Sequence, residues 1–281
     1  MAKITLLDNK PYKYELLDSY YKECETNYKN KESWIAFKRF FKSFTKKVFE
    51  TNLVIFTDKD MGNCFSLAYS ERNSYASISH SLHSITPYVL NEWHLNYKPK
   101  ESESGKQESD PKNRFVDFWC MSKNKEIEAW IEVKRIWFNF NLKTDSFAES
   151  VKKIYDGEDK DSKKMGIIQQ GLEQLDSVRT EIRNDRIANA TAFKAILLNI
   201  PISCTNPKDR KIGIEKINSA PKRLEKLLND FVKSKDFPRK NYKKSVLCAV
   251  LDLDPQGTRK GGIIYKNEYT PYFALGAIVL E

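Results

Sequence analysis

Residues 132–134 of this 281-residue chain read Glu-Val-Lys and lie in a strand-like apolar run, AWIEVKRIW. An acidic residue two positions before a lysine is a weak signal by itself. The same spacing recurs in polar segments, at Asp8, Asp110, Glu158, Asp161 and Asp209. Glu132 and Lys134 differ because apolar residues surround them, and buried charges are costly unless they are paired or bind a metal. They are therefore the first candidates for chemistry.

A second carboxylate falls opposite this pair if the surrounding residues form a hairpin. A turn centred on Asn124 and Lys125 pairs Asp117 with Glu132 across the two strands. The period-two alternation of a strand puts Lys134 on the same face. Two opposed carboxylates repel each other, and a divalent cation between them would relieve that repulsion. Oxygen-only ligands favour Mg²⁺ over zinc. The alternative is a solvent-facing hairpin whose charges are unrelated.

The elements that position these residues are predicted from hydrophobic periodicity and capping residues. Helices are expected over residues 10–50, from Ser70 to before Pro87, within 163–186 and from Ser219 onward. Strands are expected over residues 53–56, 89–97, 114–121, 126–137, 192–200, 246–251 and 272–280. Strands that alternate with helices predict an α/β fold with a mixed sheet.

Asp117, a hairpin and then the Glu-Val-Lys of residues 132–134 resemble the signature of the PD-(D/E)XK nuclease superfamily. The core of that family is a helix, a strand, a hairpin with the Asp and Glu-x-Lys residues, a second helix and a further strand. Residues 70–200 follow this order. The resemblance implies a restriction-endonuclease-like mixed central sheet flanked by helices. Residues 1–65 would form an N-terminal helical extension, and residues 66–281 the nuclease-like domain with its C-terminal strands.

The chain departs from the family in two places. Val116 stands where many members have a proline before the Asp. The Gln-x-x-x-Tyr motif of the phage-exonuclease branch is not matched, because Gln169 is followed four residues later by Glu173, and Gln170 by Gln174. This argues against a processive exonuclease. A place for Gln169 or Gln170 in the site stays open, beside the simpler interpretation of solvated helix glutamines.

The resemblance also implies roles for individual residues. Asp117, Glu132 and the Val133 carbonyl would ligate Mg²⁺, for which Mn²⁺ can substitute. The metal would lower the pKa of a bound water and neutralise charge that builds on the phosphate. Lys134 would orient or activate the attacking water and contact the scissile phosphate. Glu71 would complete the metal shell or bind a second metal. A first-turn glutamate favoured by the helix dipole is the alternative for Glu71.

The charge balance points to a polyanionic partner. The chain has 48 lysines and arginines against 38 aspartates and glutamates, a formal net charge of +10. DNA is the leading candidate for the partner, and RNA stays open. The basic residues near the motif that we predict to bind nucleic acid are Arg114, Arg135, Lys163, Lys164, Arg179, Arg183 and Arg186. The last three share one helix face, as expected for a row that follows phosphates. An ordinary charged surface is the alternative.

Other classes of site are disfavoured. The five cysteines form no CxxC pair, which excludes a zinc-ribbon motif, and scattered thiols are typical of a reducing cytosol. The histidines His80, His83 and His94 are interpreted as structural. No apolar stretch approaches the ~20 residues that span a bilayer, and no signal peptide is expected. We therefore predict a cytoplasmic protein without membrane contact.

Together these features predict a Mg²⁺-dependent endonuclease that hydrolyses DNA phosphodiester bonds, with restriction or anti-phage defence as the leading biological role. A DNA repair or recombination nuclease and an RNA nuclease are the alternatives within the enzyme class. A nucleic-acid-binding module of the same fold that does not cut is the alternative from another class, and the intact Asp/Glu/Lys set argues against it. A homodimer, or a partner subunit of a defence system, is compatible with the sequence.

Overall fold

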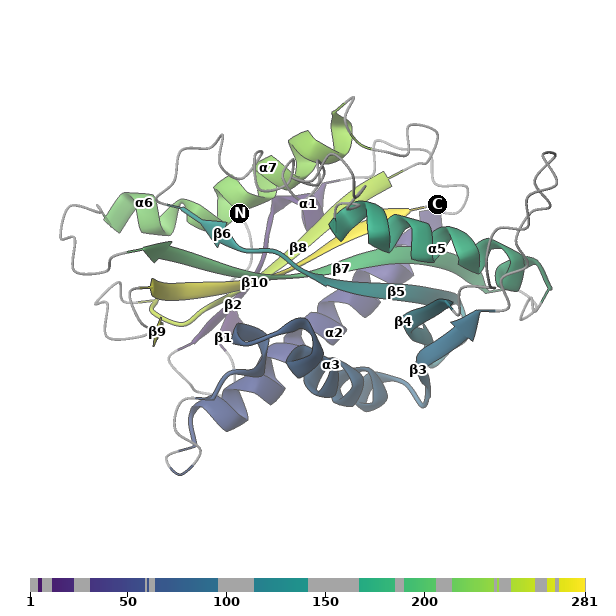
Figure 1. Cartoon of the computed structure of the whole chain (residues 1–281), viewed down its shortest axis with the longest axis horizontal. Coiled ribbons are helices and arrows are strands. Elements are labelled where there is room, and N and C mark those ends of the chain that lie inside the picture. The colour runs from purple at the N-terminus through teal and green to yellow at the C-terminus, as the bar shows by residue number, and fades with distance from the viewer. Residues whose placement is uncertain are drawn as a thin grey trace, which may run out of the picture.

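The computed structural model describes the parts of the chain that build one sheet and the helices around it. These are residues 5–6, 12–22, 31–58, 60, 64–95, 114–140, 167–184, 190–205, 214–234, 237, 244–255, 262–265 and 268–280. Within them the fold is α/β, as predicted, and helices cover both faces of a mixed sheet (Figure 1).

The described residues contribute ten strands to this sheet, in the order β1-β2-β8-β10-β7-β5-β4-β3, while β6 pairs with β7 and β9 with β10. The strands are β1 Thr5–Leu6, β2 Lys13–Leu16, β3 Tyr88–Leu95, β4 Arg114–Met121, β5 Ile127–Arg135, β6 Phe138–Asn139, β7 Thr191–Thr205, β8 Lys244–Asp252, β9 Ile263–Tyr265 and β10 Glu268–Leu280. Most neighbours are antiparallel, but β7 runs parallel to β5 and β6. The parallel β5/β7 pair requires a crossover, which α5 (Ile167–Asn184) supplies.

Helices pack on the two faces of the sheet and enclose two hydrophobic clusters (Figure 1). The first cluster lies under α2 (Lys31–Phe56), α3 (Glu71–Ile85) and the 3-10 turn η1 (Ser66–Ala68). The second lies under α5 and α7 (Ala220–Lys233). The remaining short helices are α1 (Asp18–Tyr21) and α6 (Ile214–Asn218).

The helix α2 extends past residue 50 because its apolar face continues. The predicted core-facing residues at three- and four-residue spacing are buried: Phe37, Phe41, Phe44 and Val48. The predicted strand over residues 53–56 is wrong, since these residues form the last turn of α2. Leu53 continues the buried face, whereas Val54 is 65% exposed, which a strand buried on both faces would not allow.

The helical prediction for residues 10–50 is also wrong over residues 13–16, which form β2 and pair with β8. Burial alternates with period two along this strand, with Tyr14 and Leu16 in the core. The Tyr14 hydroxyl hydrogen-bonds with the Thr45 hydroxyl of α2 at 2.9 Å. The predicted helical extension therefore contributes a strand of the central sheet as well as a helix.

The helix α3 begins and ends where predicted. The Ser70 hydroxyl accepts a hydrogen bond from the Asn73 N–H at 3.1 Å and so caps the first turn. The helix ends at Ile85, two residues before Pro87. The elements α3, β3, β4, β5, α5 and β7 then follow one another as helix, strand, hairpin, helix and strand.

Candidate active site

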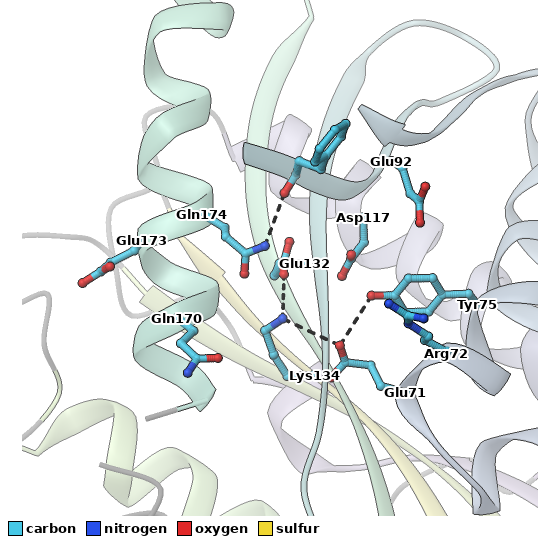
Figure 2. Close-up of a pocket in the computed structure, with 11 residues that line it drawn as sticks. Glu71, Arg72, Tyr75, Glu92, Asp117, Glu132, Lys134, Gln170, Glu173 and Gln174 are labelled. Atoms are coloured by element: carbon cyan, nitrogen blue, oxygen red, sulfur yellow. Dashed lines mark hydrogen bonds and ion pairs between the residues drawn. The ribbon is translucent and has the colours of Figure 1, made fainter. Parts of the chain in front are cut away.

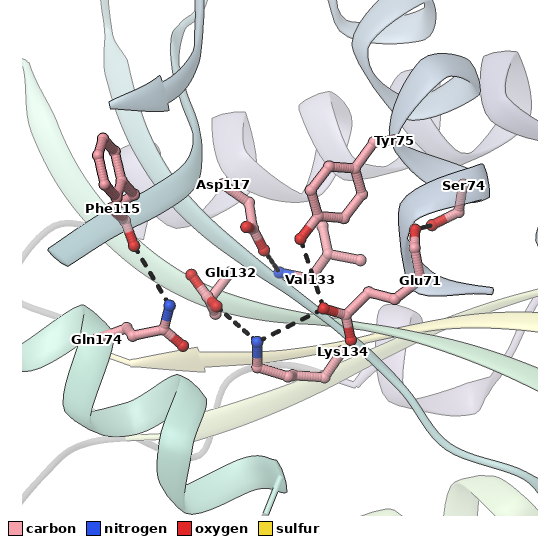
Figure 3. A network of polar contacts seen from close by, with 9 residues as sticks. All are labelled: Glu71, Ser74, Tyr75, Phe115, Asp117, Glu132, Val133, Lys134 and Gln174. Carbon is pink, nitrogen blue, oxygen red and sulfur yellow. Dashed lines mark hydrogen bonds and ion pairs between the residues drawn. The ribbon is translucent and has the colours of Figure 1, made fainter. Parts of the chain in front are cut away.

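The β4–β5 hairpin brings Asp117 and Glu132 to adjacent positions on neighbouring strands. Its ladder ends at the pair of Phe118 and Ile131, which confirms the predicted register, and Asp117 and Glu132 are the next residues along each strand. Past this point the Val133 N–H donates to Asp117 Oδ2 at 2.7 Å (Figure 3). The Asp117 side chain thus accepts a hydrogen bond from the backbone of β5. This bond holds the carboxylate at the point where the β4–β5 ladder ends.

Pairing of β4 with its other neighbour, β3, is irregular at the same level. The ladder of β3 and β4 omits Glu92 and Asp117, between the pairs Asn91–Phe118 and Trp93–Val116. Glu92 has a φ of 49°, in the left-handed region where a glutamate is strained. Strain of this kind persists only where the surrounding structure enforces it, and it clusters at functional sites.

Glu132 and Lys134 are buried together on β5, as the apolar sequence around them predicts. Glu132 is fully buried and Lys134 is 8% exposed. The Lys134 ammonium donates to Glu132 Oε1 at 2.6 Å, whereas Glu132 Oε2 is buried without a hydrogen-bond partner among the described residues. A buried polar atom without a partner costs free energy. Glu132 therefore has one oxygen available for a further donor or a cation.

The helix α3 adds a third carboxylate and a phenol to this arrangement (Figure 3). Glu71, in its first turn, has Oε1 3.8 Å from Lys134 Nζ. Tyr75, one turn later, donates from its hydroxyl to Glu71 Oε1 at 3.5 Å. The Tyr75 ring packs edge-on against Phe118, with 5.5 Å between the ring centroids.

A pocket of about 670 Å³ opens between α3 and α5 and contains the four predicted catalytic side chains (Figure 2). Its lining residues are Glu71, Arg72, Tyr75, Glu92, Phe115, Asp117, Glu132, Lys134, Gln170, Glu173 and Gln174. The helix α5 lies close to β5 here. A Cβ added at Gly171 would be only 3.5 Å from Glu132 Cγ. Five carboxylates face two cationic groups in this lining, so the pocket favours a bound cation.

Burial and mutual repulsion raise the pKa values of these carboxyl groups. Desolvation, followed by the charge of Asp117, raises the pKa of Glu132 to about 8, although Lys134 opposes the shift. Desolvation also raises the pKa of Asp117 and of Glu71. Burial by itself would lower the pKa of Lys134, but the attraction of Glu132 outweighs it and the pKa is raised, which keeps the lysine charged. A divalent cation would relieve the repulsion among the carboxylates.

Some lining residues were not predicted from the sequence. Tyr75 offered a signal, because it lies four positions after Glu71 on one face of the predicted helix. Arg72 and Glu92 are exposed, and no pattern distinguishes them from other charged surface residues. Gln174 donates to the Phe115 carbonyl at 3.3 Å, a tertiary contact between α5 and β4 that the sequence alone does not indicate.

The predictions for the two glutamines of α5 and for Val133 have different outcomes. Gln170 lines the pocket, whereas Gln169 donates to Glu173 at 3.4 Å. The Val133 side chain is buried in the cluster under α2 and α3. The backbone N–H of Val133 donates to Asp117 Oδ2. The role of the Val133 carbonyl as a metal ligand stays a prediction.

The predicted nucleic-acid-binding residues lie outside the pocket lining or outside the described residues. The Arg135 guanidinium donates to the Ala68 carbonyl and lies over the Trp137 ring, 4.5 Å from its centroid, so it is engaged within the chain. For three residues the backbone is described but the side chain is not: Arg114, Arg179 and Arg183. Three others lie outside the described residues: Lys163, Lys164 and Arg186.

Among the residues that the structure describes, no histidine or cysteine lines this pocket. His80 and His83 are exposed on α3, and His94 contacts the Phe115 ring edge-on at 5.0 Å. The described cysteines form no disulfides with one another: Cys64, Cys120, Cys204 and Cys248. Oxygen atoms are therefore the donors that the pocket offers to a metal.

Asp117 and Glu132 fit Mg²⁺ as ligands by their chemistry. Mg²⁺ often binds one or two protein carboxylates and retains several waters or substrate oxygens, and the unpartnered Glu132 Oε2 provides a buried donor atom. Among the described residues, no group of three or more His, Cys, Asp or Glu side chains forms a ready-made metal cluster. Mg²⁺ bound by Asp117 and Glu132 would complete its shell with water or substrate oxygens.

No family model, no curated protein and no solved structure matches this chain. In the part of the chain that the structure describes, no helix is both long enough and apolar enough to cross a membrane.

Proposed function

We propose that this protein is a metal-dependent endonuclease that hydrolyses DNA phosphodiester bonds and has a restriction-endonuclease-like core of the PD-(D/E)XK type. The observation that carries the proposal is the cluster at the end of the β4–β5 ladder. Asp117 and Glu132 are adjacent across the strands, and Lys134 is bonded to Glu132 inside a pocket rich in carboxylates. A purely structural ion pair would have its remaining polar atoms satisfied, whereas Glu132 Oε2 has no partner among the described residues.

The order of the elements supports the same proposal. The helix α3 provides Glu71, the β4–β5 hairpin provides Asp117, Glu132 and Lys134, and α5 crosses over to the parallel strand β7. This is the order of helix, strand, hairpin, helix and strand that the resemblance to the superfamily implies. The resemblance thereby extends from residue types to the elements that carry them.

Each residue of the cluster would have its own role in hydrolysis. Asp117 and Glu132 would hold Mg²⁺, which would supply an acidified water and neutralise charge at the phosphate. Lys134 presents a protonated ammonium that orients the attacking water and contacts the scissile phosphate. Its burial makes that charge more effective than it would be in bulk water. The carboxylates of the pocket repel a phosphate until their charge is neutralised, so cutting should depend strictly on a divalent cation.

Metal dependence is the first test. Purified protein incubated with plasmid DNA is expected to nick or cut with Mg²⁺ or Mn²⁺ and to be silent in EDTA or with Ca²⁺, which binds oxygen ligands but supports this chemistry poorly. The readout is conversion of supercoiled plasmid to open-circle and linear forms. Equal cutting in EDTA would exclude a metal mechanism.

Two substitutions test the residues. Lys134→Ala removes the water-orienting ammonium, and Asp117→Asn removes one ligand charge but keeps an acceptor for the Val133 N–H. Both variants are expected to fold and bind DNA, and to lose cutting by at least about 10²-fold, the usual scale for a catalytic group. Lys46→Ala is the matched control, because Lys46 pairs with Glu50 on α2 and does not line the pocket. Wild-type cutting by Lys134→Ala would refute the assignment.

Binding to DNA is expected to depend strongly on salt. The acidic pocket contributes little affinity for phosphates, so the attraction has to come from the rest of the chain, whose net charge is +10. Release of counterions then makes affinity fall steeply with salt concentration. Fluorescence anisotropy of a labelled duplex at several salt concentrations measures this slope. A slope near zero would show that the net positive charge of the chain is not used for DNA binding.

Restriction or anti-phage defence is the biological role that we favour, with DNA repair or recombination as the alternative. This role is favoured by the presence of Asp117, Glu132 and Lys134 together with the net positive charge of the chain. Expression in a bacterial host is expected to reduce plaque counts of infecting phage, and Lys134→Ala should abolish that protection. Unchanged plaque counts together with altered sensitivity to DNA damage would favour repair. Protection that survives in Lys134→Ala would favour a binding module.

A further inference from the structure

A second pocket, of about 410 Å³, lies between α2 and the turn that joins β4 to β5. One face of α2 lines it, together with the end of α3 and residues of the turn. The lining residues are Ala36, Arg39, Phe40, Ser43, Ile85, Ser122, Lys123, Asn124 and Glu126. Among these described residues the cations Arg39 and Lys123 outnumber the acid Glu126, so we call this site the basic pocket.

The turn that presents Lys123 and Asn124 to the basic pocket is held in place by hydrogen bonds. The Ser122 hydroxyl accepts the backbone N–H groups of Glu126 and Ile127, each at 3.1 Å. The side chains of Lys123 and Asn124 are exposed on this turn. Because the backbone is already ordered, a ligand that binds here loses little affinity to the ordering of the turn.

The helix α2 presents a cation and a hydroxyl on the other side of the basic pocket. Arg39 and Ser43 lie one helical turn apart and are both exposed, as is Lys42 between them. A guanidinium can donate two parallel hydrogen bonds to a phosphate, and a serine hydroxyl is a further phosphate donor. The active-site pocket has the opposite balance, five carboxylates and two cations. The basic pocket is therefore the better match for an anion.

The helix α3 connects the two pockets. Glu71 at its start lines the active-site pocket, and Ile85 at its end lines the basic pocket. The helix has 15 residues, which places its ends about 21 Å apart. The six residues from Glu126 to Glu132 give about 20 Å along the strand. After Glu71 the helix contains no acidic residue, and its exposed side chains are Arg72, Asn73, Ala76, His80, His83 and Ser84.

We propose that the basic pocket binds the phosphate backbone of the same DNA that is cut at the active-site pocket. At 3.4 Å per nucleotide along a strand, a separation of about 20 Å corresponds to about six base pairs. Phosphate contacts fix the position and orientation of a duplex without reading its sequence, so this pocket holds DNA in register with the catalytic cluster. The inference rests on the proposed function for the identity of the polyanion, but it concerns affinity and not chemistry.

The test compares the double variant Arg39→Ala/Lys123→Ala with wild type in binding of a labelled duplex long enough to reach both pockets. Fluorescence anisotropy is measured at several salt concentrations, with Ca²⁺ in place of Mg²⁺ to prevent cutting. Two lost phosphate contacts should lower affinity by at least about tenfold and reduce the log–log salt slope by about 2. Thermal unfolding midpoints should stay unchanged, because both side chains are exposed.

The matched control is Lys222→Ala/Lys226→Ala. These lysines are exposed on α7, which packs over the other hydrophobic cluster, and their removal lowers the net charge by the same amount. The control should keep the wild-type affinity and slope. The proposal is overturned if Arg39→Ala/Lys123→Ala binds like wild type. It is also overturned if both double variants lose equally, because binding would then follow net charge and not this pocket.

Cutting separates this inference from the proposed function. Arg39→Ala/Lys123→Ala should cut slowly at limiting DNA and recover the wild-type rate at saturating DNA, because the catalytic cluster is intact. Lys134→Ala should show the reverse, with near wild-type affinity and lost cutting at any DNA concentration. A wild type that binds DNA through the basic pocket but never cuts would support the inference and refute the endonuclease. A wild type without affinity for DNA would overturn both.

Discussion

Carboxylates lie in the core around Glu132 on β5 and also at the end of β8, where Asp254 is buried and Asp252 is half-buried. Desolvation raises the pKa of Asp252 to about 6, as it raises that of Glu132 to about 8. At the end of β8, however, Asp254 Oδ2 accepts the Tyr269 hydroxyl at 2.6 Å, and Asp252 Oδ1 accepts the Asp254 N–H at 2.9 Å. A raised pKa thus reports burial in both regions and does not by itself identify a functional site.

What distinguishes the pocket is an incomplete set of partners. Glu132 Oε2 lacks a hydrogen bond within the described residues, and the neighbouring cation, Lys134, is bonded to the other oxygen. Each region also has a tyrosine donor, but Tyr269 makes a short bond to Asp254, at 2.6 Å, whereas Tyr75 makes a long one to Glu71, at 3.5 Å. We therefore interpret the β8 region as structural and the β5 region as a binding site.

Removal of one carboxylate from each region is the strongest test of this difference. Glu132→Gln is expected to lower DNA cutting by at least about 10²-fold, because a ligand charge is lost beside the phosphate. Asp254→Asn keeps an acceptor for the Tyr269 hydroxyl and should leave cutting unchanged. Initial rates on supercoiled plasmid with Mg²⁺ measure both. Equal losses in the two variants would mean that the Glu132 effect comes from folding.

A smaller effect is expected from Lys134→Met, which removes the cation that occupies Glu132 Oε1. Without this competitor, we expect Ca²⁺ to bind about tenfold more tightly, equivalent to about 1.4 kcal/mol, although cutting is lost. The titration has to be done at alkaline pH, because loss of the lysine raises the pKa of Glu132 further above about 8. Lys46→Met is the matched control. Weaker Ca²⁺ binding by Lys134→Met would show that the lysine organises the site rather than competing for it.

Much of the fold near the site could be predicted because its signals are local. The Ser70 cap defines the start of α3, Pro87 follows its end, and the turn at Asn124 and Lys125 sets the hairpin register. Period-two alternation then places Glu132 and Lys134 on one face. These features depend on neighbours within a few residues, and the structure agrees with each of them.

The remaining features depend on tertiary contacts that a sequence pattern does not contain. The strand β2 exists because β8 offers a partner for its backbone, and four residues are too few to reveal a period. Residues 53–56 form a short apolar run, and such a run is compatible both with a strand and with the end of a helix. In the site, Glu92 reaches the pocket from an exposed position on β3 and Gln174 from a half-buried one on α5. Tyr75 lines the pocket only because α3 packs against β5.

The smallest expected effect concerns stability and comes from Asp252→Asn in the β8 region. The pKa of Asp252 is raised from an ordinary 3.8 to about 6 in the folded protein, mainly by desolvation. The folded state therefore holds this proton more tightly than the unfolded state does. The contribution of Asp252 to stability is most favourable below about pH 4, declines as the pH rises to about 6, and stays low above that value.

Asparagine cannot ionise, yet it still accepts the Asp254 N–H. We expect Asp252→Asn to be more stable than wild type by about 1 kcal/mol near neutral pH, a value reduced for partial exposure to solvent, and to match wild type near pH 4. Urea unfolding midpoints at the two pH values measure the difference. Asp230→Asn, on the exposed side of α7, should have no effect at either pH. A gain that persists unchanged at pH 4 would show that ionisation of Asp252 is not its cause. An accompanying loss of DNA cutting would mean that the β8 region is not purely structural.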